Sequence, residues 1–288
     1  MNWIITSFFM FCASIIYYLI LRKATINKIN YRFSNIANFS IPAVLFFILN
    51  IVQNKNMFLP YGTLFLIGLS SFFLSYLSSS ASYIALAKAP NAGYSLIIQK
   101  SYAVYTSIAA IYLFHSSITP LKFIAILITL ASIVFISISP NKQKIIHKDN
   151  MWIILSFIAF FGFGTLRLAN KGFVNMGVPS TVLLFWTMVF VASFSILDYL
   201  IRGQKQGLKI NKQDLLVLFG VGFSVTFFYY FLQISEVAAP NIGYVNVINS
   251  SSNALYTLLV AWIFKDKLTK NKLLAVITAT IGIILLLV

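Results

Sequence analysis

The chain has 288 residues, of which 60% are hydrophobic and only 9% are charged, and its formal net charge is +16. This balance excludes a soluble globular domain, in which charged residues make up about a quarter of the chain. A single cysteine, Cys12, excludes an internal disulfide, and the two histidines match no metal-ligand spacing. We therefore expect no metal and no cofactor.

In chain order, the apolar residues form blocks of roughly 17–25 positions, the length that crosses the hydrocarbon core of a bilayer. We predict an all-α integral membrane protein with about ten transmembrane helices. Their ranges are 3–21, 36–52, 61–87, 92–114, 121–139, 151–170, 179–201, 214–237, 242–264 and 272–288. The first block lacks a basic leader and a cleavage site, so we interpret it as a membrane helix rather than a signal peptide.

The basic residues are distributed unevenly between the predicted connections. Sixteen of the 21 lie in the odd-numbered connections, whereas the even-numbered ones hold only Lys55, Lys122 and Lys171. Because basic loops stay in the cytoplasm, this bias predicts that both termini lie outside the cell membrane. The high net charge therefore reflects the topology of the chain in the membrane, and we do not expect nucleic-acid binding.

A short phrase, A-P-N-x-G-Y, occurs at residues 89–94 and again at 239–244. At the same offset of 150 residues, Thr119 falls opposite Thr269 without a gap. The phrase is typical of a tight corner, in which Pro and Asn stop one helix and Asn caps the next. The match therefore indicates either a repeated unit or a chance likeness between apolar sequences.

The loop charges favour the repeat. A unit of five helices re-enters the membrane inverted, and equivalent connections of the two halves indeed carry opposite charge bias. We predict two inverted five-helix repeats, 1–139 and 151–288, joined by a connecting loop at 140–150. Inverted repeats are typical of secondary transporters, whose substrate site lies near the midplane between the repeats.

Two cations lie inside predicted spans, Lys100 and Arg167. A charge in hydrocarbon is costly, so each is a candidate for binding a carboxylate- or phosphate-bearing substrate. The alternative is that they pair with Asp198 or Glu236, or that they extend to the interface. We expect Asp198 to pair with Arg202 at i,i+4, and Glu236 is a candidate site for proton coupling.

Polar side chains recur every three to four residues on two of the predicted helices, one in each repeat. The fourth helix carries Ser95, Gln99, Tyr102 and Thr106, and the ninth carries Asn246, Asn249, Asn253 and Thr257. We interpret these stripes as the lining of a hydrated path, with hydrogen bonding between helices as the alternative.

Aromatic residues are abundant, and most of them are expected to face lipid. Those that are candidates for holding an organic substrate are Tyr83, Trp186, Tyr229, Tyr230 and Tyr244. The sequence leaves open whether the protein is a monomer or a dimer, and we expect its partners to be a small-molecule substrate and the lipid bilayer.

The second half closes with the letters FKDKLTKNKLLAVITATIGIILL, which contain Asp266, Thr269 and Gly282. This segment resembles the repeat-closing pattern of EamA-type ten-helix transporters, a group of the drug/metabolite transporter superfamily. The first half departs from the pattern, because Ser116 stands where the acidic residue is expected. The resemblance implies two five-helix repeats, amino acids or related metabolites as substrates, and both termini inside the cell. The last point conflicts with the charge bias.

These observations predict a secondary transporter that moves a small polar or anionic metabolite by alternating access. The sequence leaves open whether the direction is import or export. The alternative is a flippase for a lipid-linked headgroup, as smaller relatives in the superfamily are. A membrane enzyme is disfavoured, because five acids and two scattered histidines form no acid–base or metal cluster.

Overall fold

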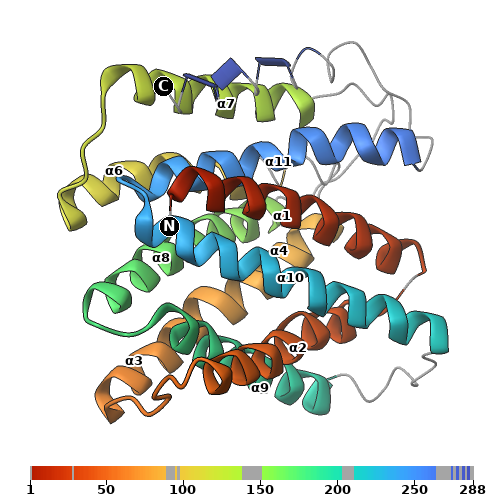
Figure 1. Cartoon of the computed structure of the whole chain (residues 1–288). Coiled ribbons are helices and arrows are strands. Elements are labelled where there is room, and N and C mark those ends of the chain that lie inside the picture. Colours follow the sequence, from red (N-terminus) through yellow and green to blue (C-terminus); the bar gives the residue numbers. More distant parts are fainter. Residues whose placement is uncertain are drawn as a thin grey trace.

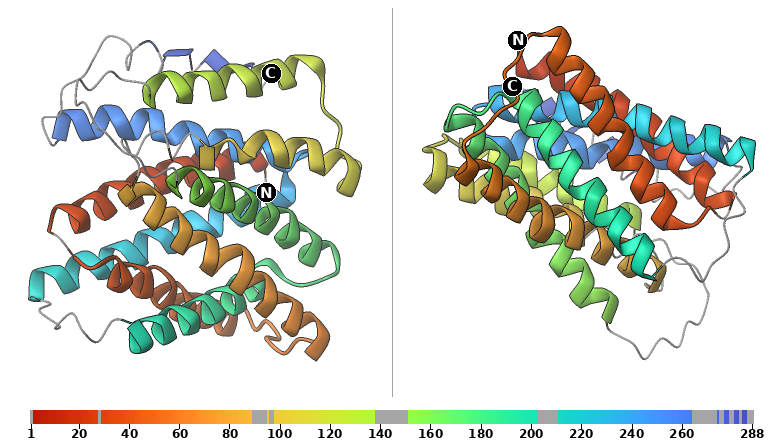
Figure 2. Two further views of the ribbon diagram at one scale, coloured as in Figure 1. Left: turned by 180° about the vertical axis from the view of Figure 1, so that it is seen from behind. Right: turned by 90° about the horizontal axis from the view of Figure 1, so that it is seen from below.

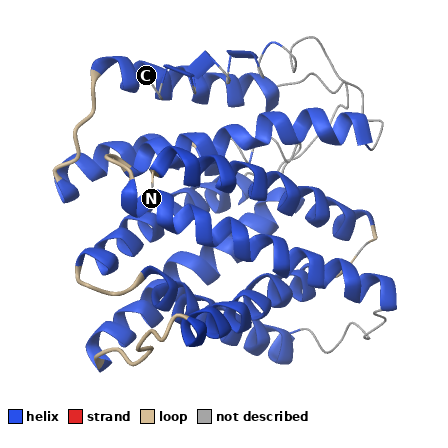
Figure 3. Cartoon of the chain, in the orientation of Figure 1, coloured by secondary structure: helices blue, strands red, loops and turns tan. Residues whose placement is uncertain are grey.

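The computed structural model describes residues 2–27, 29–88, 95, 98–137, 151–202 and 211–263, and seven residues between 274 and 285. Within these ranges all regular secondary structure is helical and no strand occurs (Figure 3). The predicted all-α class is therefore confirmed.

The helices run close to one another along the length of the molecule (Figure 1). They are α1 (Trp3–Ile26), α2 (Tyr31–Val52), α3 (Tyr61–Ser70), η1 (Ser71–Tyr76), α4 (Leu77–Lys88), α6 (Tyr102–Phe114), α7 (Pro120–Ser137), α8 (Met151–Asn175), α9 (Ser180–Arg202), α10 (Lys212–Ala238) and α11 (Ile242–Ile263). α3, η1 and α4 follow one another without a break and form the third span of the chain. η1 is a single π-helical turn within it.

Six helices in the described part of the chain are long and apolar enough to cross a membrane, and this confirms the multi-pass prediction. They are Trp3–Ala24, Tyr31–Val52, Tyr61–Ala85, Met151–Asn175, Ser180–Arg202 and Lys212–Ala238. The 22-residue α11 is not among them, because asparagine and serine recur along it and lower its hydropathy. It nevertheless runs beside α1 and α6 in the bundle (Figure 1).

Several predicted boundaries differ from the structure by about five residues: α1 ends at Ile26 rather than at 21, and α2 begins at Tyr31 rather than at 36. The sixth helix was expected to end at residue 170, but α8 continues to Asn175, so Lys171 belongs to the helix rather than to a connection. The polar letters NKGFVN suggest a loop, yet the Lys171 ammonium is buried and donates to the carbonyl oxygen of Ala239 at 3.2 Å. The bonded partner offsets the cost of burying the charge.

The helices pack in reciprocal pairs that link the two halves of the chain (Figures 1 and 2). α1 packs on α10, and α8 packs on α4, so the first helix of each predicted repeat meets the third span of the other. α2 packs on α9, and α6 packs on α11. Two inverted repeats related by a twofold axis would pair their helices in this reciprocal way. The repeat boundaries themselves stay a prediction.

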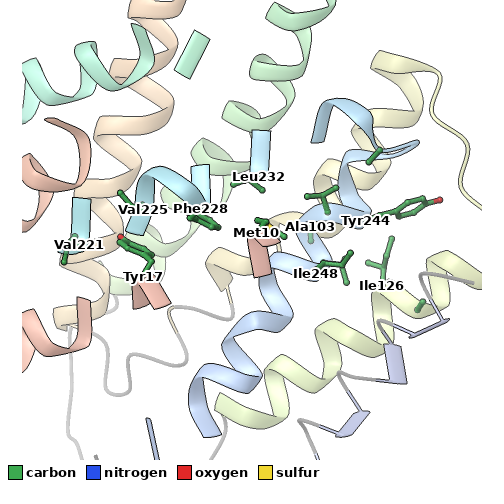
Figure 4. Close-up of a cluster of buried hydrophobic side chains, with 14 of the residues drawn as sticks. Met10, Tyr17, Ala103, Ile126, Val221, Val225, Phe228, Leu232, Tyr244 and Ile248 are labelled. Carbon is green, nitrogen blue, oxygen red and sulfur yellow. The ribbon is translucent and has the colours of Figure 1, made fainter. Parts of the chain in front are cut away.

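A cluster of buried hydrophobic side chains packs between α1, α10 and α11 (Figure 4). Its buried side chains include Met10 from α1, Phe228 and Leu232 from α10, and Ile248 from α11. Because α1 belongs to the first half and α10 and α11 to the second, this burial joins the halves into one body.

Polar contacts bring the first and the seventh connection together at one end of the bundle. At the start of α2, Arg32 Nε lies 3.0 Å from Asp198 Oδ2 at the end of α9. Asn27 Nδ2 donates to Asp214 Oδ1 at 3.3 Å, which joins the end of α1 to the start of α10. We call this the basic end; its described cations are Arg22, Lys23, Arg32, Arg202 and Lys212.

Candidate functional site

A central cavity of about 150 Å³ lies between helices from both halves of the chain. Its lining is polar and aromatic, and the residues that α1 and α2 contribute lie on the parts of these helices nearer the basic end. The lining residues are Tyr17, Tyr18, Leu21, Asn35, Asn38, Ser79, Ser82, Tyr83, Gln99, Lys100, Tyr102, Phe163, Arg167, Phe228, Tyr229 and Asn249.

Two wider hollows, of about 430 and 510 Å³, lie elsewhere on the bundle. They are almost wholly apolar, and lining residues such as Phe65 and Phe157 are exposed on the outer surface. A lipid-facing apolar groove is ordinary for a membrane helix bundle. The polar central cavity is therefore the candidate site.

Lys100 supplies a buried positive charge to this cavity. Its Nζ donates to the hydroxyl oxygen of Tyr18 at 3.2 Å and lies 5.5 Å from the centroid of the same ring. Lys100 is only 9% exposed, and no carboxylate is among the described residues that line the cavity. A neutral phenol leaves most of the ammonium charge uncompensated, so the position favours an anionic ligand.

The neighbouring Gln99 fixes this segment in place. Its Oε1 accepts from Ser82 Oγ of α4 at 2.7 Å, and its Nε2 donates to Ser95 Oγ at 2.8 Å. Ser95 Oγ in turn lies 2.7 Å from Ser156 Oγ of α8. The chain of hydrogen bonds holds the backbone next to Lys100 against α4 and α8.

The two predicted polar stripes face each other, and their described side chains mostly form hydrogen bonds between α6 and α11. Asn246 Nδ2 donates to Thr106 Oγ1 at 3.0 Å, and Asn249 Nδ2 donates to Tyr102 Oη at 3.4 Å. Only Asn249 and Tyr102 of these four also line the cavity, because Asn246 and Thr106 are packed behind it. The side chains of Asn253 and Thr257 lie outside the described residues.

Arg167, the second predicted cation, lines the cavity and has an acidic partner behind it. Its Nε lies 3.8 Å from Glu236 Oε1, and the two side chains are 10% and 1% exposed. The guanidinium carbon also lies 6.0 Å from the centroid of the Tyr229 ring. Of the two alternatives that the sequence left open, pairing with Glu236 is found for Arg167, whereas Lys100 has no acidic partner among the described residues.

Asp198 pairs with Arg202, as the i,i+4 spacing predicts, at 3.6 Å. Its nearer partner is Arg32, at 3.0 Å, on a helix far away in the sequence. The pair lies at the basic end and not in the cavity, so it holds α2 to α9.

The structure brings seven of the predicted site residues to the cavity: Tyr83, Gln99, Lys100, Tyr102, Arg167, Tyr229 and Asn249. It does not bring Trp186 or Tyr230 there. Trp186 donates its indole N–H to the carbonyl oxygen of Met57 at 2.9 Å, and Tyr230 packs against the cluster between α2 and α9.

Sequence reasoning missed part of the lining, namely Tyr17 and Tyr18 of α1 and Asn35 and Asn38 of α2. A signal for the asparagines was present, because two amides at i,i+3 in an apolar helix define one polar face. In the described part of the chain, no three metal-ligating side chains come together.

The bundle and its site are those of a multi-pass α-helical membrane protein with an internal polar cavity. Residues 150–288 match the family model of the EamA-like transporter family. The match spans 139 of the 288 residues and confirms the resemblance to EamA-type members of the drug/metabolite transporter superfamily, which indicates a membrane transporter of small solutes.

Other comparisons support the fold. One solved structure, described only as a crystal structure of a protein, superposes with a TM-score of 0.82 at 12% sequence identity. The match covers 98% of this chain and 94% of the other, so the two share their fold over nearly their whole length. Among curated proteins, none matches the sequence significantly.

Proposed function

We propose that this protein is a secondary transporter that moves a small organic anion across the cell membrane by alternating access. Amino acids and related carboxylate metabolites are the proposed substrate class. The observation that carries the proposal is the buried ammonium of Lys100, which faces a central cavity whose described lining residues include no carboxylate.

The rest of the lining suits such a substrate. Tyr17, Tyr83 and Phe228 offer ring faces for an apolar portion, and Asn35 and Asn38 offer amide groups. Ligand sites in general combine apolar walls with a few placed polar groups. A volume of about 150 Å³ suits a small metabolite rather than a lipid-linked headgroup, which disfavours the flippase alternative.

Both halves of the chain contribute to the cavity, and this supports alternating access. α1, α2 and α4 belong to the first predicted repeat, whereas α8, α10 and α11 belong to the second. Movement of one repeat against the other would change which end of the bundle the cavity faces. The parts of α1 and α2 that line it are near the basic end, which the charge bias places in the cytoplasm.

Uptake and efflux by proteoliposomes against a panel of amino acids, carboxylates and phosphates tests the proposal. We expect Lys100→Gln to raise the KM for the transported anion by about tenfold or more, because a hydrogen bond to a charged group contributes about 1.5–3 kcal/mol. Lys100→Arg should keep most of the activity.

Lys55→Gln is the matched control, since Lys55 is exposed in the connection between α2 and α3. Its kinetics should equal those of the unmodified protein. If Lys100→Gln moved the same anion at unchanged rate and KM, recognition of the anion by Lys100 would be refuted.

A further inference from the structure

Four buried polar side chains face one another between α8 and α10. Arg167 Nε lies 3.8 Å from Glu236 Oε1, and one turn further along α8, Asn170 Nδ2 donates to Gln233 Oε1 at 3.4 Å. The i,i+3 spacing on both helices puts the four groups on facing surfaces. Glu236 is two residues from the end of α10, so this cluster extends from the cavity toward the end opposite the basic end.

The carboxylate of Glu236 depends on Arg167 for its stability. Neither of its oxygens, nor Arg167 Nε, has a hydrogen-bond partner among the described residues, and Glu236 is 1% exposed. A buried carboxylate without donors is costly, and the nearby guanidinium charge is what offsets that cost.

The other groups that face Glu236 contribute less to holding it ionised. The second cation of α8, Lys171, acts on it electrostatically, but its ammonium is bonded to the carbonyl oxygen of Ala239. The neutral phenols that act on Arg167 belong to Tyr18 on α1, Tyr102 on α6 and Tyr229 on α10 itself. Lys100 is the other cation of the cavity lining. In the described part of the chain, Arg167 is therefore the cation that both the cavity and Glu236 contact.

We propose that Arg167 couples anion binding to proton uptake: a substrate anion in the cavity and the Glu236 carboxylate compete for one guanidinium. When the anion pairs with Arg167, the positive field at Glu236 is neutralised, and Glu236 takes up a proton from solution. This proposal rests on the proposed anion transport and deepens it by naming the coupled ion.

The charges balance. Binding of a monoanion adds one negative charge to the site, and formation of one O–H bond on Glu236 adds one positive charge. The net charge between α8 and α10 then stays the same, so the loaded site crosses the low-dielectric interior without an extra charge. The transported unit is one anion with one proton.

The first test follows the carboxyl group itself. In the purified full-length protein, the infrared band of a protonated carboxyl is recorded against pH, and the Glu236 contribution is the part lost in Glu236→Gln. In Arg167→Gln that band should persist to a pH about one unit higher or more, because a full charge has been removed. Arg167→Lys should behave like the unmodified protein, and it guards against an effect of misfolding.

The second test adds a probe anion. Benzoate and inorganic phosphate are the probes, benzyl alcohol is the uncharged control, and binding is followed by calorimetry. In the unmodified protein and in Lys171→Gln, a bound anion should move the midpoint of the Glu236 band upward. In Arg167→Gln it should not move, and benzyl alcohol should have no effect in any variant.

The outcomes separate this inference from the function on which it rests. If benzoate or phosphate binds and the midpoint stays where it was, the coupling is overturned and anion recognition stands. If neither anion binds while Arg167→Gln still shifts the band, anion recognition is overturned and the coupling with it. An unshifted band in Arg167→Gln overturns the role of Arg167 directly.

Discussion

Asn50 on α2 and Thr181 on α9 exchange two hydrogen bonds: the Thr181 hydroxyl donates to Asn50 Oδ1 at 2.6 Å, and Asn50 Nδ2 donates to the Thr181 carbonyl oxygen at 3.0 Å. At the other end of the same helix pair, Asn35 Nδ2 donates to Ser195 Oγ at 3.1 Å. The two contacts are about four turns apart. They hold the antiparallel helices α2 and α9 together near both ends of the pair.

Replacement of Asn50 tests how much this contact stabilises the bundle. Asn50→Ala removes both hydrogen bonds and leaves the buried Thr181 hydroxyl without its partner, so we expect a loss of about 1–2 kcal/mol in the free energy of unfolding. The readout is the thermal unfolding midpoint of the purified protein. Ser193→Ala, on the exposed face of α9, should leave that midpoint unchanged. Equal midpoints for the two variants would contradict the prediction.

Gly243, in the second copy of the A-P-N-x-G-Y phrase, allows α11 to pack closely on α6. A Cβ at this position would lie 2.7 Å from the Cα atom of Ser107, so backbone would have to move. We expect Gly243→Ala to lower the unfolding midpoint by several degrees, because overpacking costs about 1–3 kcal/mol.

Gly172 provides the matched comparison for that change. It lies within α8, and a Cβ there would meet nothing within 4 Å. Gly172→Ala should therefore be neutral or stabilising by up to about 1 kcal/mol, since alanine favours the helix. A similar loss of stability in both variants would show that the close packing at Gly243 is unimportant.

Tyr18→Phe separates the hydroxyl that bonds Lys100 from the ring that lines the cavity. In this variant the Lys100 ammonium loses the hydroxyl oxygen to which it donates at 3.2 Å but keeps the aromatic face. We expect a rise of a few-fold in the KM for the transported anion, because a hydrogen bond to a charged group orients the ammonium. Transport kinetics in proteoliposomes measure this. Tyr112→Phe, exposed on α6, is the control and should have no effect.

Single cysteines test the orientation. In a chain whose Cys12 has been replaced by serine, Lys55→Cys should react with a membrane-impermeant maleimide on intact cells. Lys23→Cys, at the basic end, should react only after permeabilisation, because basic connections remain in the cytoplasm. The reverse pattern would place both termini inside, as the family resemblance implies.

Much of the fold was predictable because apolar block length alone defines a membrane helix. The prediction was wrong at the end of α8, where Lys171 and its polar neighbours resemble a loop. The carbonyl oxygen that the Lys171 ammonium contacts belongs to Ala239, 68 positions further along the chain. A sequence pattern carries no information about such a contact.

The site was partly predictable for a related reason. Lys100 and Arg167 stand out because a charge inside an apolar span is rare. Tyr17 and Tyr18 do not, because the chain has 15 tyrosines and most face lipid or other rings. The Arg167–Glu236 pair was one of the alternatives that the sequence left open, and choosing it required knowing that α8 and α10 lie side by side.

The π-helical turn η1 constrains how the length of this chain can vary between related proteins. A π turn holds one residue more than an α-helical turn, so loss of one residue from Ser71–Tyr76 can restore a regular helix with both flanking faces preserved. Loss of one residue from the start of α4 would instead rotate Ser79, Ser82 and Tyr83 by about 100° away from the cavity. Single-residue length differences in this span are therefore expected within η1, where substrate recognition is insulated from them.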